Sequence, residues 1–329
     1  MEEAIIKIHK QFSYVPKVHN TDALASHKQF ILCGMGGSHL SAGILKMWKP
    51  GINLYVHKDY DLPPYDESFL EDSLLIASSY SGNTEEVLSF TEAALERGLS
   101  VAVITTGGAL LELAKKHHLP YIQMPNDTVQ PRTALGYSLI AIATFVNEPG
   151  CVSDVHRLGE TFRAEMYRSF GEDIANEIGD ALPVVYTSSA NLNIAYNWKI
   201  TFNETGKIPA FYNIFPEVNH NEMQGYDEYN HPVHFIMLRD TADHSRVQKR
   251  MSITADMLEE RGYNVTTLLL PGNTLLEKVF ISLAIADWTA LSVAEAKNSD
   301  PVAVPMIESF KHELKDAYND RFIDGNTLI

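Results

Sequence analysis

Cysteine and positive charge are both scarce in this sequence. The two cysteines, Cys33 and Cys151, lie in different segments, so we expect no disulfide between them and a reduced, cytoplasmic setting. Lys and Arg number 26 against 42 Asp and Glu, which leaves a net charge of −16, and no Lys/Arg run interrupts the acidic excess. A nucleic-acid partner is therefore not expected. An acidic chain that binds an anion must place its few cations locally.

Signals for membranes, targeting and metals are also missing. Glu2 and Glu3 stand where a signal peptide needs basic residues, and no apolar run approaches the roughly 20 residues of a membrane span. We therefore expect neither a leader nor a membrane partner. The chain has 13 histidines but no HExxH motif, no CxxC motif and no compact His/Asp cluster, so we assign no metal.

What the sequence does contain is an alternation of short apolar runs with amphipathic segments. Its 329 residues are long for one core and sufficient for two α/β domains. Alternating strands and helices indicate a parallel sheet covered on both faces. In the first half the pattern predicts strands at 30–33, 53–56, 73–77, 101–104 and 121–123, and helices at 38–48, 84–97, 110–117 and 135–146.

The segment Asn147-Glu-Pro-Gly150 breaks this alternation, so we place a domain boundary there, with domains at 1–150 and 151–329. After a polar helix at 154–170, the pattern predicts strands at 184–186, 233–238 and 265–270, and helices at 192–203, 245–261 and 274–296. The halves are weak copies in element order, since FILCGMGGSHLSA parallels PVVYTSSANLNIA. We predict an α/β fold of two doubly wound parallel-sheet domains.

The turn Gly34-Met-Gly-Gly-Ser38 joins a predicted strand to a predicted helix. Glycines allow close backbone approach, and the helix start offers free N–H groups to an anion. A purely structural turn and a dinucleotide loop remain open as alternatives. Against the latter, His39 stands where a GxGxxG motif needs its third glycine, although Asp59 could mimic a ribose-binding acid.

A second turn, Ser79-Tyr-Ser-Gly-Asn-Thr84, also follows a strand and precedes a helix. Hydroxyls and backbone N–H groups bind a phosphate without fixed positive charge, which suits an acidic chain. A helix cap is the simpler alternative, but a cap needs one such residue and this turn has several. Because ligands of parallel sheets lie beyond the carboxyl ends of the strands, both turns are predicted to face one ligand.

Together GMGGS and SYSGNTEE resemble the SIS (sugar isomerase) domain. Further segments make the chain similar to the bifunctional phosphoglucose/phosphomannose isomerase family, in order and over nearly its whole length: QPRTALGYSL (Gln130–Leu139), NETGKIPAF (Asn203–Phe211), FPEVNHNEMQGY (Phe215–Tyr226) and DPVAVPMIESFKHEL (Asp300–Leu314). The resemblance implies an aldose–ketose isomerase of glycolysis that interconverts glucose 6-phosphate with fructose 6-phosphate, without a cofactor. Mannose 6-phosphate is the second candidate aldose.

The resemblance also implies residue roles. Glu204 matches the carboxylate base and Arg132 the cation near the enediolate. His220 matches an imidazole that opens the sugar ring and comes from the partner subunit of a homodimer, while Lys311 matches a lysine beside the ring oxygen. The sugar-contacting and phosphate-binding residues implied are Gly36, Gly37, Ser38, Ser79, Ser81 and Thr84.

The residue types suit this chemistry. A carboxylate can take and return a proton when burial or negative neighbours raise its pKa, and Glu204 ends a helix, just before a predicted Gly206 cap, where the dipole disfavours an acid. A guanidinium can stabilise the enediolate, and an imidazole can pass protons near working pH. Glu217 and Glu222 flank His220 and could orient it.

Simpler interpretations stay open for each residue. Glu204 could be a solvated acid paired with Lys207, Arg132 a surface arginine, His220 a structural histidine, and Lys311 a solvated lysine on a helix.

Two features bear on specificity and on rival functions. The stretch after Asp300-Pro301 reads Val-Ala-Val-Pro, with no hydroxyl, which puts phosphomannose activity in doubt; Thr133 is a minor variation beside Arg132. A sugar-phosphate-sensing regulator needs a DNA-binding domain, and an amidotransferase-type synthase needs an N-terminal cysteine; the sequence indicates neither. A non-catalytic sugar-phosphate binder and a NAD(P)-dependent dehydrogenase are the remaining rivals.

Overall fold

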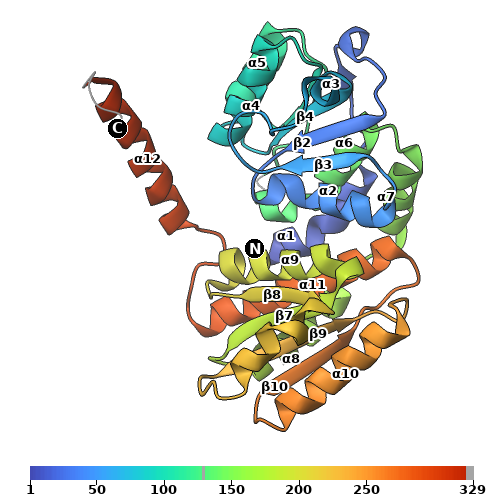
Figure 1. Cartoon of the computed structure of the whole chain (residues 1–329), viewed down its shortest axis with the longest axis vertical. Coiled ribbons are helices and arrows are strands. Elements are labelled where there is room, and N and C mark those ends of the chain that lie inside the picture. The colour runs from blue at the N-terminus through green and yellow to red at the C-terminus, as the bar shows by residue number, and fades with distance from the viewer. Residues whose placement is uncertain (128–129, 324–329) are drawn as a thin grey trace.

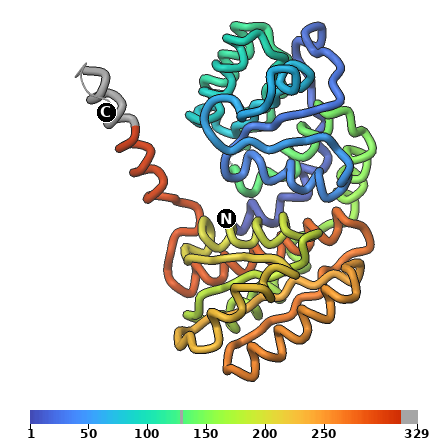
Figure 2. The backbone as a smooth tube through the Cα atoms, in the orientation of Figure 1, coloured from blue at the N-terminus to red at the C-terminus, as the bar shows by residue number. Residues whose placement is uncertain are grey.

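The computed structural model describes residues 1–127 and 130–323 and contains two sheets, one in each half of the chain (Figures 1 and 2). The first sheet has the strand order β1-β6-β5-β4-β2-β3 and the second β10-β9-β7-β8. Strands β5-β4-β2-β3 therefore match β10-β9-β7-β8 in order, with β2 equivalent to β7 and β4 to β9. The predicted doubly wound α/β fold is confirmed.

The first sheet is parallel apart from its edge strand β1, which pairs antiparallel with β6. Apolar side chains alternate between its faces: Leu32 and Ile76 point to one core, Ile31 and Leu75 to the other. Both faces need helices, because neither can meet water. The elements are β1 (Val18–His19), β2 (Gln29–Cys33), β3 (Leu54–His57), β4 (Ser73–Ser79), β5 (Val101–Thr105), β6 (Tyr121–Gln123), α1 (Glu2–Ile6), α2 (Gly37–Trp48), α3 (Glu67–Glu71), α4 (Glu85–Glu96), α5 (Gly108–Lys116) and α6 (Leu135–Phe145).

The second sheet is parallel throughout and is also covered on both faces. Val184 and Phe235 pack with Met251 of α10 on one side, whereas Val185 and Ile236 join the core shared with the first half. The elements are α7 (Pro149–Thr161), α8 (Arg168–Ile178), β7 (Leu182–Ser188), α9 (Leu192–Thr201), β8 (Phe211–Phe215), β9 (Val233–Arg239), α10 (Ser245–Glu259), β10 (Asn264–Leu269), α11 (Leu275–Ala296) and α12 (Pro305–Ile323).

One continuous apolar layer lies between the two sheets and joins the halves. Helices α2 and α6 line it from the first half and α9 and α11 from the second. Among the described residues, α11 is the helix long and apolar enough to cross a membrane, but 78% of its apolar window is buried inside the chain. Such burial is typical of the core helix of a two-sheet protein.

Several details of the predicted secondary structure are wrong, and the short elements α1, β1 and α3 were not predicted. The helix predicted at 154–170 is two helices, because the chain leaves α7 at Phe162, whose extended backbone (ψ 131°) turns its ring into the core against Phe12. Strand β8 was not predicted; it is short, and only Phe215 of its five residues is buried. The boundary at 147–150 stays a prediction.

Helix α12 extends away from the rest of the molecule (Figure 1). Its apolar side chains Met306, Ile307 and Phe310 are exposed. The helix begins at Pro305, next to a segment that contacts the site described below.

Candidate active site

The two ligand-binding turns predicted from the sequence are joined directly in the structure. They follow β2 and β4, which are neighbours in the parallel sheet. The Tyr80 backbone N–H donates to the Ser38 hydroxyl (3.0 Å), and the Ser78 hydroxyl donates to the Ser38 carbonyl (2.9 Å). Ser38 is buried and connects the turns, so its side chain holds them together.

The Ser79–Thr84 turn is lined with hydroxyls that bond to one another and to its own backbone. The Ser79 and Thr84 hydroxyls are 2.8 Å apart, and the Gly82 N–H donates to Ser79 (3.0 Å). Ser81 is exposed and accepts from the Asn83 N–H (3.2 Å). Gly82 has φ +70° and approaches Gly107 so closely that a Cβ would lie 1.8 Å from its carbonyl oxygen. The turn is thus fixed by α4 behind it and the neighbouring loop.

The glycine turn approaches the loop that carries Arg132. A Cβ added at Gly37 would lie 2.5 Å from the carbonyl atoms of Pro131 and 2.7 Å from the Arg132 nitrogen. Gly37 therefore allows two backbone segments to touch. Gly36, by contrast, is exposed at the start of α2 with φ +50°, and its surroundings are open.

Arg132 connects the two halves of the molecule at this point. Its guanidinium donates to a Glu204 carboxylate oxygen (3.1 Å), the Thr205 hydroxyl (3.0 Å) and the Pro301 carbonyl (2.8 Å). The Arg132 side chain is 3% exposed and that of Glu204 27%. Burial lowers the pKa of Arg132, and the carboxylates of Glu204 and Asp287 oppose that shift. The arrangement is a buried cation facing a half-buried acid beside the glycine turn.

Glu204 lies in a single π-helical turn, Phe202–Gly206, that continues α9. The prediction that Gly206 caps the helix is wrong: Lys207 takes the left-handed conformation (φ 57°) after the last turn. The Lys207 ammonium bonds the backbone carbonyls of Glu204 and Ala303, so it does not neutralise the Glu204 carboxylate directly. π-Turns often mark functional sites, and here the turn presents the acid to Arg132.

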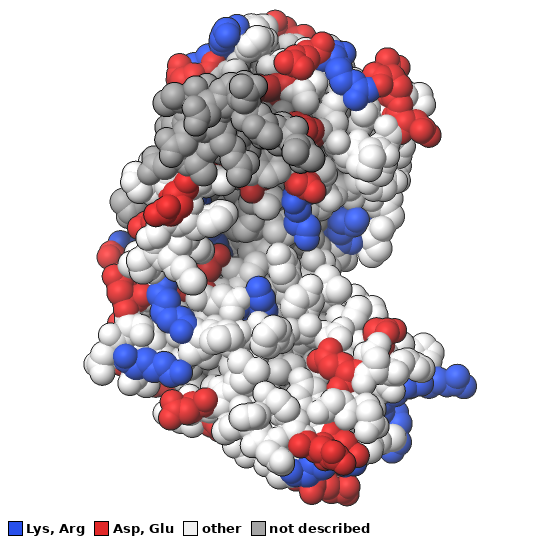
Figure 3. Space-filling model, turned by 60° about the vertical axis from the view of Figure 1, so that its left-hand side comes forward, with Lys and Arg blue, Asp and Glu red and all other residues white. Residues whose placement is uncertain are grey.

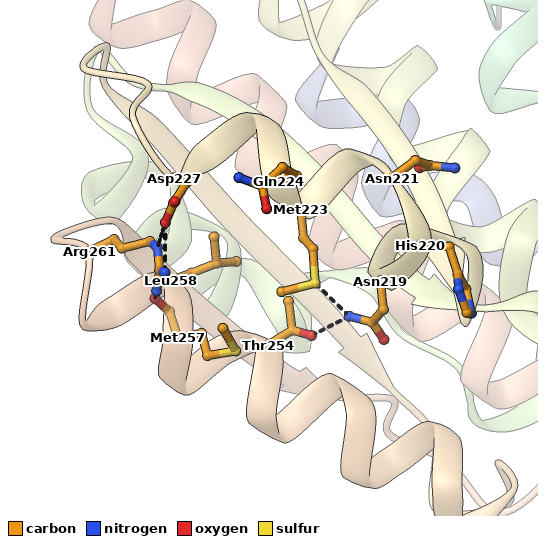
Figure 4. A pocket seen from close by; sticks show the side chains of 10 residues that line it. All are labelled: Asn219, His220, Asn221, Met223, Gln224, Asp227, Thr254, Met257, Leu258 and Arg261. Carbon is orange, nitrogen blue, oxygen red and sulfur yellow. Dashed lines mark hydrogen bonds and ion pairs between the residues drawn. The ribbon is translucent and has the colours of Figure 1, made fainter.

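His220 of the same chain does not join this site. Helix α9 returns antiparallel to the strands, so Glu204 lies at the amino edge of the second sheet, while His220 follows the carboxyl end of β8. The five residues of β8 span about 17 Å. His220 is exposed and lies at one end of a pocket of about 390 Å³, which Asn219 and Met223 also line (Figure 4).

The acids that flank His220 do not orient it within this chain. Glu217 accepts a hydrogen bond from Asn221, and Glu222 accepts from Asn213 and from the Tyr186 hydroxyl (2.6 Å). The expectation that either carboxylate holds the imidazole is wrong for the single chain.

Lys311 is exposed on α12 and is also apart from the site. The segment before α12 does reach it, because Pro301 and Ala303 bond Arg132 and Lys207. The structure thus brings together the two turns, Arg132 and Glu204, and leaves His220 and Lys311 outside.

His39 explains why the glycine turn departs from a dinucleotide motif. Its ring is buried and lies 5.8 Å from that of Tyr196 on α9. Burial, with a smaller effect of Lys58, lowers its pKa to about 4, so the ring is neutral. His39 therefore stands at the position of the third glycine and contacts the second half of the chain through Tyr196.

Thr205 and Asp287 were not predicted at the site, and Lys207 was expected only as an ion-pair partner of Glu204. Thr205 and Lys207 lie within the NETGK segment, and their closeness to Glu204 in the sequence could have indicated them. Asp287 is the single charged residue between Val279 and Ala294 in the apolar helix α11, and an isolated acid in such a run is itself a signal.

No group of three or more potential metal ligands occurs among the described residues. On the face drawn in Figure 3 the surface is indented between the two halves, and Lys and Arg are scattered rather than gathered into a patch.

Known proteins share both the sequence and the fold. A profile of the bacterial phospho-glucose isomerase C-terminal SIS domain matches residues 169–314. A bifunctional phosphoglucose/phosphomannose isomerase of Aquifex aeolicus (strain VF5) is 36% identical over 303 residues, which cover 89% of this chain and 92% of that relative. The chain belongs to the bifunctional phosphoglucose/phosphomannose isomerase family.

Further similarities agree with this family. Another bifunctional phosphoglucose/phosphomannose isomerase, of Caldicellulosiruptor bescii, is 34% identical and covers 87% of this chain and 89% of its own. A hypothetical protein of Thermus thermophilus shares the fold with a TM-score of 0.72 at 15% identity, covering 96% of this chain and 88% of that one. The family predicted from the motifs is confirmed, and the roles of individual residues stay predictions.

Proposed function

We propose that this member of the phosphoglucose/phosphomannose isomerase family interconverts glucose 6-phosphate and fructose 6-phosphate. The observation that carries the proposal is the Arg132–Glu204 ion pair (3.1 Å), held where the glycine turn meets the second half of the chain. Aldose–ketose isomerisation needs one base and one cation for the enediolate, and this pair supplies both.

The proposed reaction moves one proton from C2 to C1 and a second one from O2 to O1. With the sugar ring open, the Glu204 carboxylate takes the proton from C2 of the aldose; the electron pair forms the C1–C2 double bond, and the former carbonyl oxygen O1 becomes an enediolate. Arg132 stabilises this charge. The O2 hydroxyl proton passes to O1, and Glu204 returns its proton to C1, so that C1 becomes CH2OH and O2 becomes the ketose carbonyl. No hydride leaves the substrate, so the proposal needs no redox cofactor.

The Ser79–Thr84 turn is the proposed phosphate site. Ser79, Ser81 and Thr84 supply hydroxyls, and the start of α4 adds backbone N–H groups and the positive end of its dipole. Gly36 and Gly37 let the sugar approach the backbone closely, with Ser38 fixing the turns relative to each other.

The proposed active unit is a homodimer in the cytoplasm. His220 and Lys311 are exposed in the single chain and separate from Glu204, so a second copy is needed to bring an imidazole to the ring oxygen. The exposed Met306, Ile307 and Phe310 of α12 give that copy an apolar surface to cover. Sedimentation equilibrium tests this: an active species that stays monomeric at assay concentration contradicts a shared site.

The main rival is a sugar-phosphate binder without turnover. It needs the two turns but not a buried cation beside an acid, so the Arg132–Glu204 pair favours the enzyme. A coupled assay decides between them: purified protein receives fructose 6-phosphate, and glucose 6-phosphate and mannose 6-phosphate are measured separately. Binding without either product identifies the binder.

Glu204→Gln tests the base. We expect turnover to fall at least about 1,000-fold while fructose 6-phosphate still binds within about threefold, because the amide keeps the shape of the acid but cannot take a proton. Glu260→Gln, which makes the same change at an exposed position after α10, serves as the matched control. Unchanged turnover in Glu204→Gln refutes the assignment.

The same assay tests whether the protein also forms mannose 6-phosphate. Val302 and Ala303 lie in the segment that bonds Arg132 and Lys207, and neither has a hydroxyl to offer the sugar. We therefore propose glucose 6-phosphate as the preferred aldose. Equal rates of formation of mannose 6-phosphate and glucose 6-phosphate contradict this preference.

A further inference from the structure

The side chain of Lys207 joins two parts of the active site that are far apart in the sequence. Its ammonium donates to the backbone carbonyl of Glu204 in the π-turn and to that of Ala303, which lies in an exposed segment just before α12. Arg132 makes the same connection at a second point, because it donates to the Glu204 carboxylate and to the Pro301 carbonyl (2.8 Å). Two cations therefore connect the π-turn to this segment.

The backbone conformation of Lys207 is unusual for its residue type. Its φ of 57° lies in the left-handed region, where glycine is favoured and a lysine is rare. The other non-glycine residues with positive φ in the described part of the chain are of the types that tolerate it best: Asn20, Asp61, His118, Asn147 and Asn298. A lysine kept in this conformation at the end of the turn that carries Glu204 indicates a function of its side chain.

The end of the π-turn does not depend on that side chain. The N–H groups of Lys207 and Ile208 both donate to the Phe202 carbonyl, and the Asn203 amide donates to the Ile208 carbonyl (3.0 Å). These bonds close the turn through the backbone and Asn203, so a glycine could stand at position 207 without opening it. The two hydrogen bonds of the ammonium are what a glycine would lack.

Segment 301–303 has little else to hold it in place. It belongs to no helix or strand, and Val302 and Ala303 are exposed. Asp300 accepts the N–H groups of Val302 (2.8 Å) and Ala303 (3.3 Å), which shapes the segment locally but does not attach it to the rest of the molecule. Within the described residues, the hydrogen bonds that attach it come from Arg132 and Lys207.

We propose that Lys207 is a positioning residue that fastens the turn carrying Glu204 to segment 301–303, and so fixes the base relative to this side of the sugar site. The proposal rests on the isomerase function given above. Lys207 does not touch the reacting atoms and acts through the Glu204 backbone. Because a displacement of about 1 Å in a catalytic group can reduce turnover about 100-fold, a bond on the base's own turn bears directly on kcat.

The first test uses the full-length protein in the fructose 6-phosphate assay. Lys207→Met keeps the length of the side chain but removes its donors, so we expect kcat to fall about 10- to 100-fold while KM changes less than about threefold. Lys207→Arg restores N–H donors and should keep kcat within about fivefold of the wild type. Lys116→Met makes the same change at an exposed position in the last turn of α5 and serves as the control. A wild-type kcat in Lys207→Met overturns the proposal.

Lys207→Gly separates the side chain from the backbone. Glycine adopts positive φ without strain, so a residue that served only to end the π-turn could be replaced by glycine with no loss of kcat. Our proposal instead predicts a loss of kcat as large as in Lys207→Met, with a melting temperature within about 3 °C of the wild type. Full turnover in Lys207→Gly contradicts the proposal. Because glycine suits this backbone, the test does not depend on the methionine variant folding.

Hydrogen exchange measures the attachment of segment 301–303 without any catalysis. The N–H groups of Val302 and Ala303 are bonded to Asp300 and exchange when the segment opens. We expect peptides that cover 300–304 to exchange at least about tenfold faster in Lys207→Met than in the wild type or in Lys116→Met. Equal exchange in the three proteins shows that Lys207 does not hold the segment.

The two measurements also distinguish this proposal from the one on which it rests. A wild type that binds fructose 6-phosphate but forms no aldose phosphate refutes the isomerase function, whereas hydrogen exchange still decides whether Lys207 holds the segment. A wild type that turns over, with Lys207→Met unchanged in kcat and in exchange, refutes the role of Lys207 alone.

Discussion

The two halves of the chain repeat one fold but carry opposite chemistry at the same place. After β4 the first half has Ser79, Ser81 and Thr84. After β9, the equivalent strand, the second half has Asp240 and Asp243. A loop of hydroxyls and free N–H groups attracts a phosphate, whereas two carboxylates repel it.

In the loop after β9, the carboxylates are already bonded to neighbouring side chains. Lys278 pairs with Asp240 (2.6 Å), and the Ser188 hydroxyl donates to Asp243 (2.6 Å), with Asn191 bonded to Ser188 (3.1 Å). Strand order alone therefore does not make a binding site. The second half contributes its acid, Glu204, from the opposite edge of its sheet, and thus serves the site of the first half.

The largest effect is expected when an acid is introduced into the Ser79–Thr84 turn of the first half. Ser81→Asp keeps the side-chain acceptor for the Asn83 N–H but adds a negative charge. Two unit charges about 5 Å apart repel by roughly 3 kcal/mol at an effective dielectric of about 20, so we expect KM for fructose 6-phosphate to rise at least about 100-fold. Ser81→Asn is the uncharged control. A KM that changes equally in both variants argues against a phosphate at this turn.

A second substitution tests how closely the glycine turn must approach Arg132. In Gly37→Ala the new Cβ meets the Pro131 carbonyl at 2.5 Å, so one of the two backbones must move. We expect kcat to fall about tenfold or more and the free energy of unfolding to fall by about 1–3 kcal/mol. Gly51→Ala, where nothing lies within 4 Å, is the control. Denaturant unfolding and steady-state kinetics measure these effects. The prediction is contradicted if Gly37→Ala and Gly51→Ala both match the wild type.

The halves should also differ in how pH affects stability. Burial raises the pKa of Asp287 to about 7 and that of Asp243 above its usual range, and both lie in the second half, whereas the hydroxyl loop of the first has no such acid. An acid with a raised folded-state pKa contributes stability that is complete below its unfolded pKa, about 4, and that is lost as pH rises through about 7 for Asp287.

The expected result is a melting temperature that falls between about pH 4 and pH 7. Asp287→Asn should remove a few degrees of that fall, and Asp243→Asn a smaller part. Scanning calorimetry at several pH values measures this difference. If the melting temperature depends on pH in the same way in both variants and in the wild type, these acids do not titrate as described.

The smallest effect is expected at the second loop itself. Asp243→Asn should leave kcat and KM within about twofold of the wild type, since this loop does not contact the site. Titration calorimetry with fructose 6-phosphate should give one bound ligand per chain for both proteins. Two ligands per chain would show that the repeated fold binds twice, and the contrast between the halves would fail.

The sequence predicted the fold well wherever local pattern decides the structure. Helix α4 was expected at 84–97 and spans Glu85–Glu96, because its apolar spacing and Gly98 define both ends. The pattern failed where distant packing decides, as at Phe162, which leaves its helix to reach Phe12.

For the site, the motifs located the residues but not their partners. The ion pair of Arg132 and Glu204 joins positions 72 residues apart, and no spacing rule predicts such a contact. His220 was expected to reach Glu204 from a partner subunit, which a single chain does not test, and Lys311 lies apart from Glu204 within the chain. Asp287 lies in no motif, and its electrostatic effect on Arg132 depends on which face of α11 meets the π-turn.

The contact of Arg132 with Glu204 has one further consequence. The cation belongs to one copy of the repeated fold and the acid to the other. A lone copy of this domain holds only half of the pair, so it could reach the same chemistry only by docking against another copy through the face that α2 and α9 now share. Duplication within one gene would have made that encounter permanent and independent of concentration.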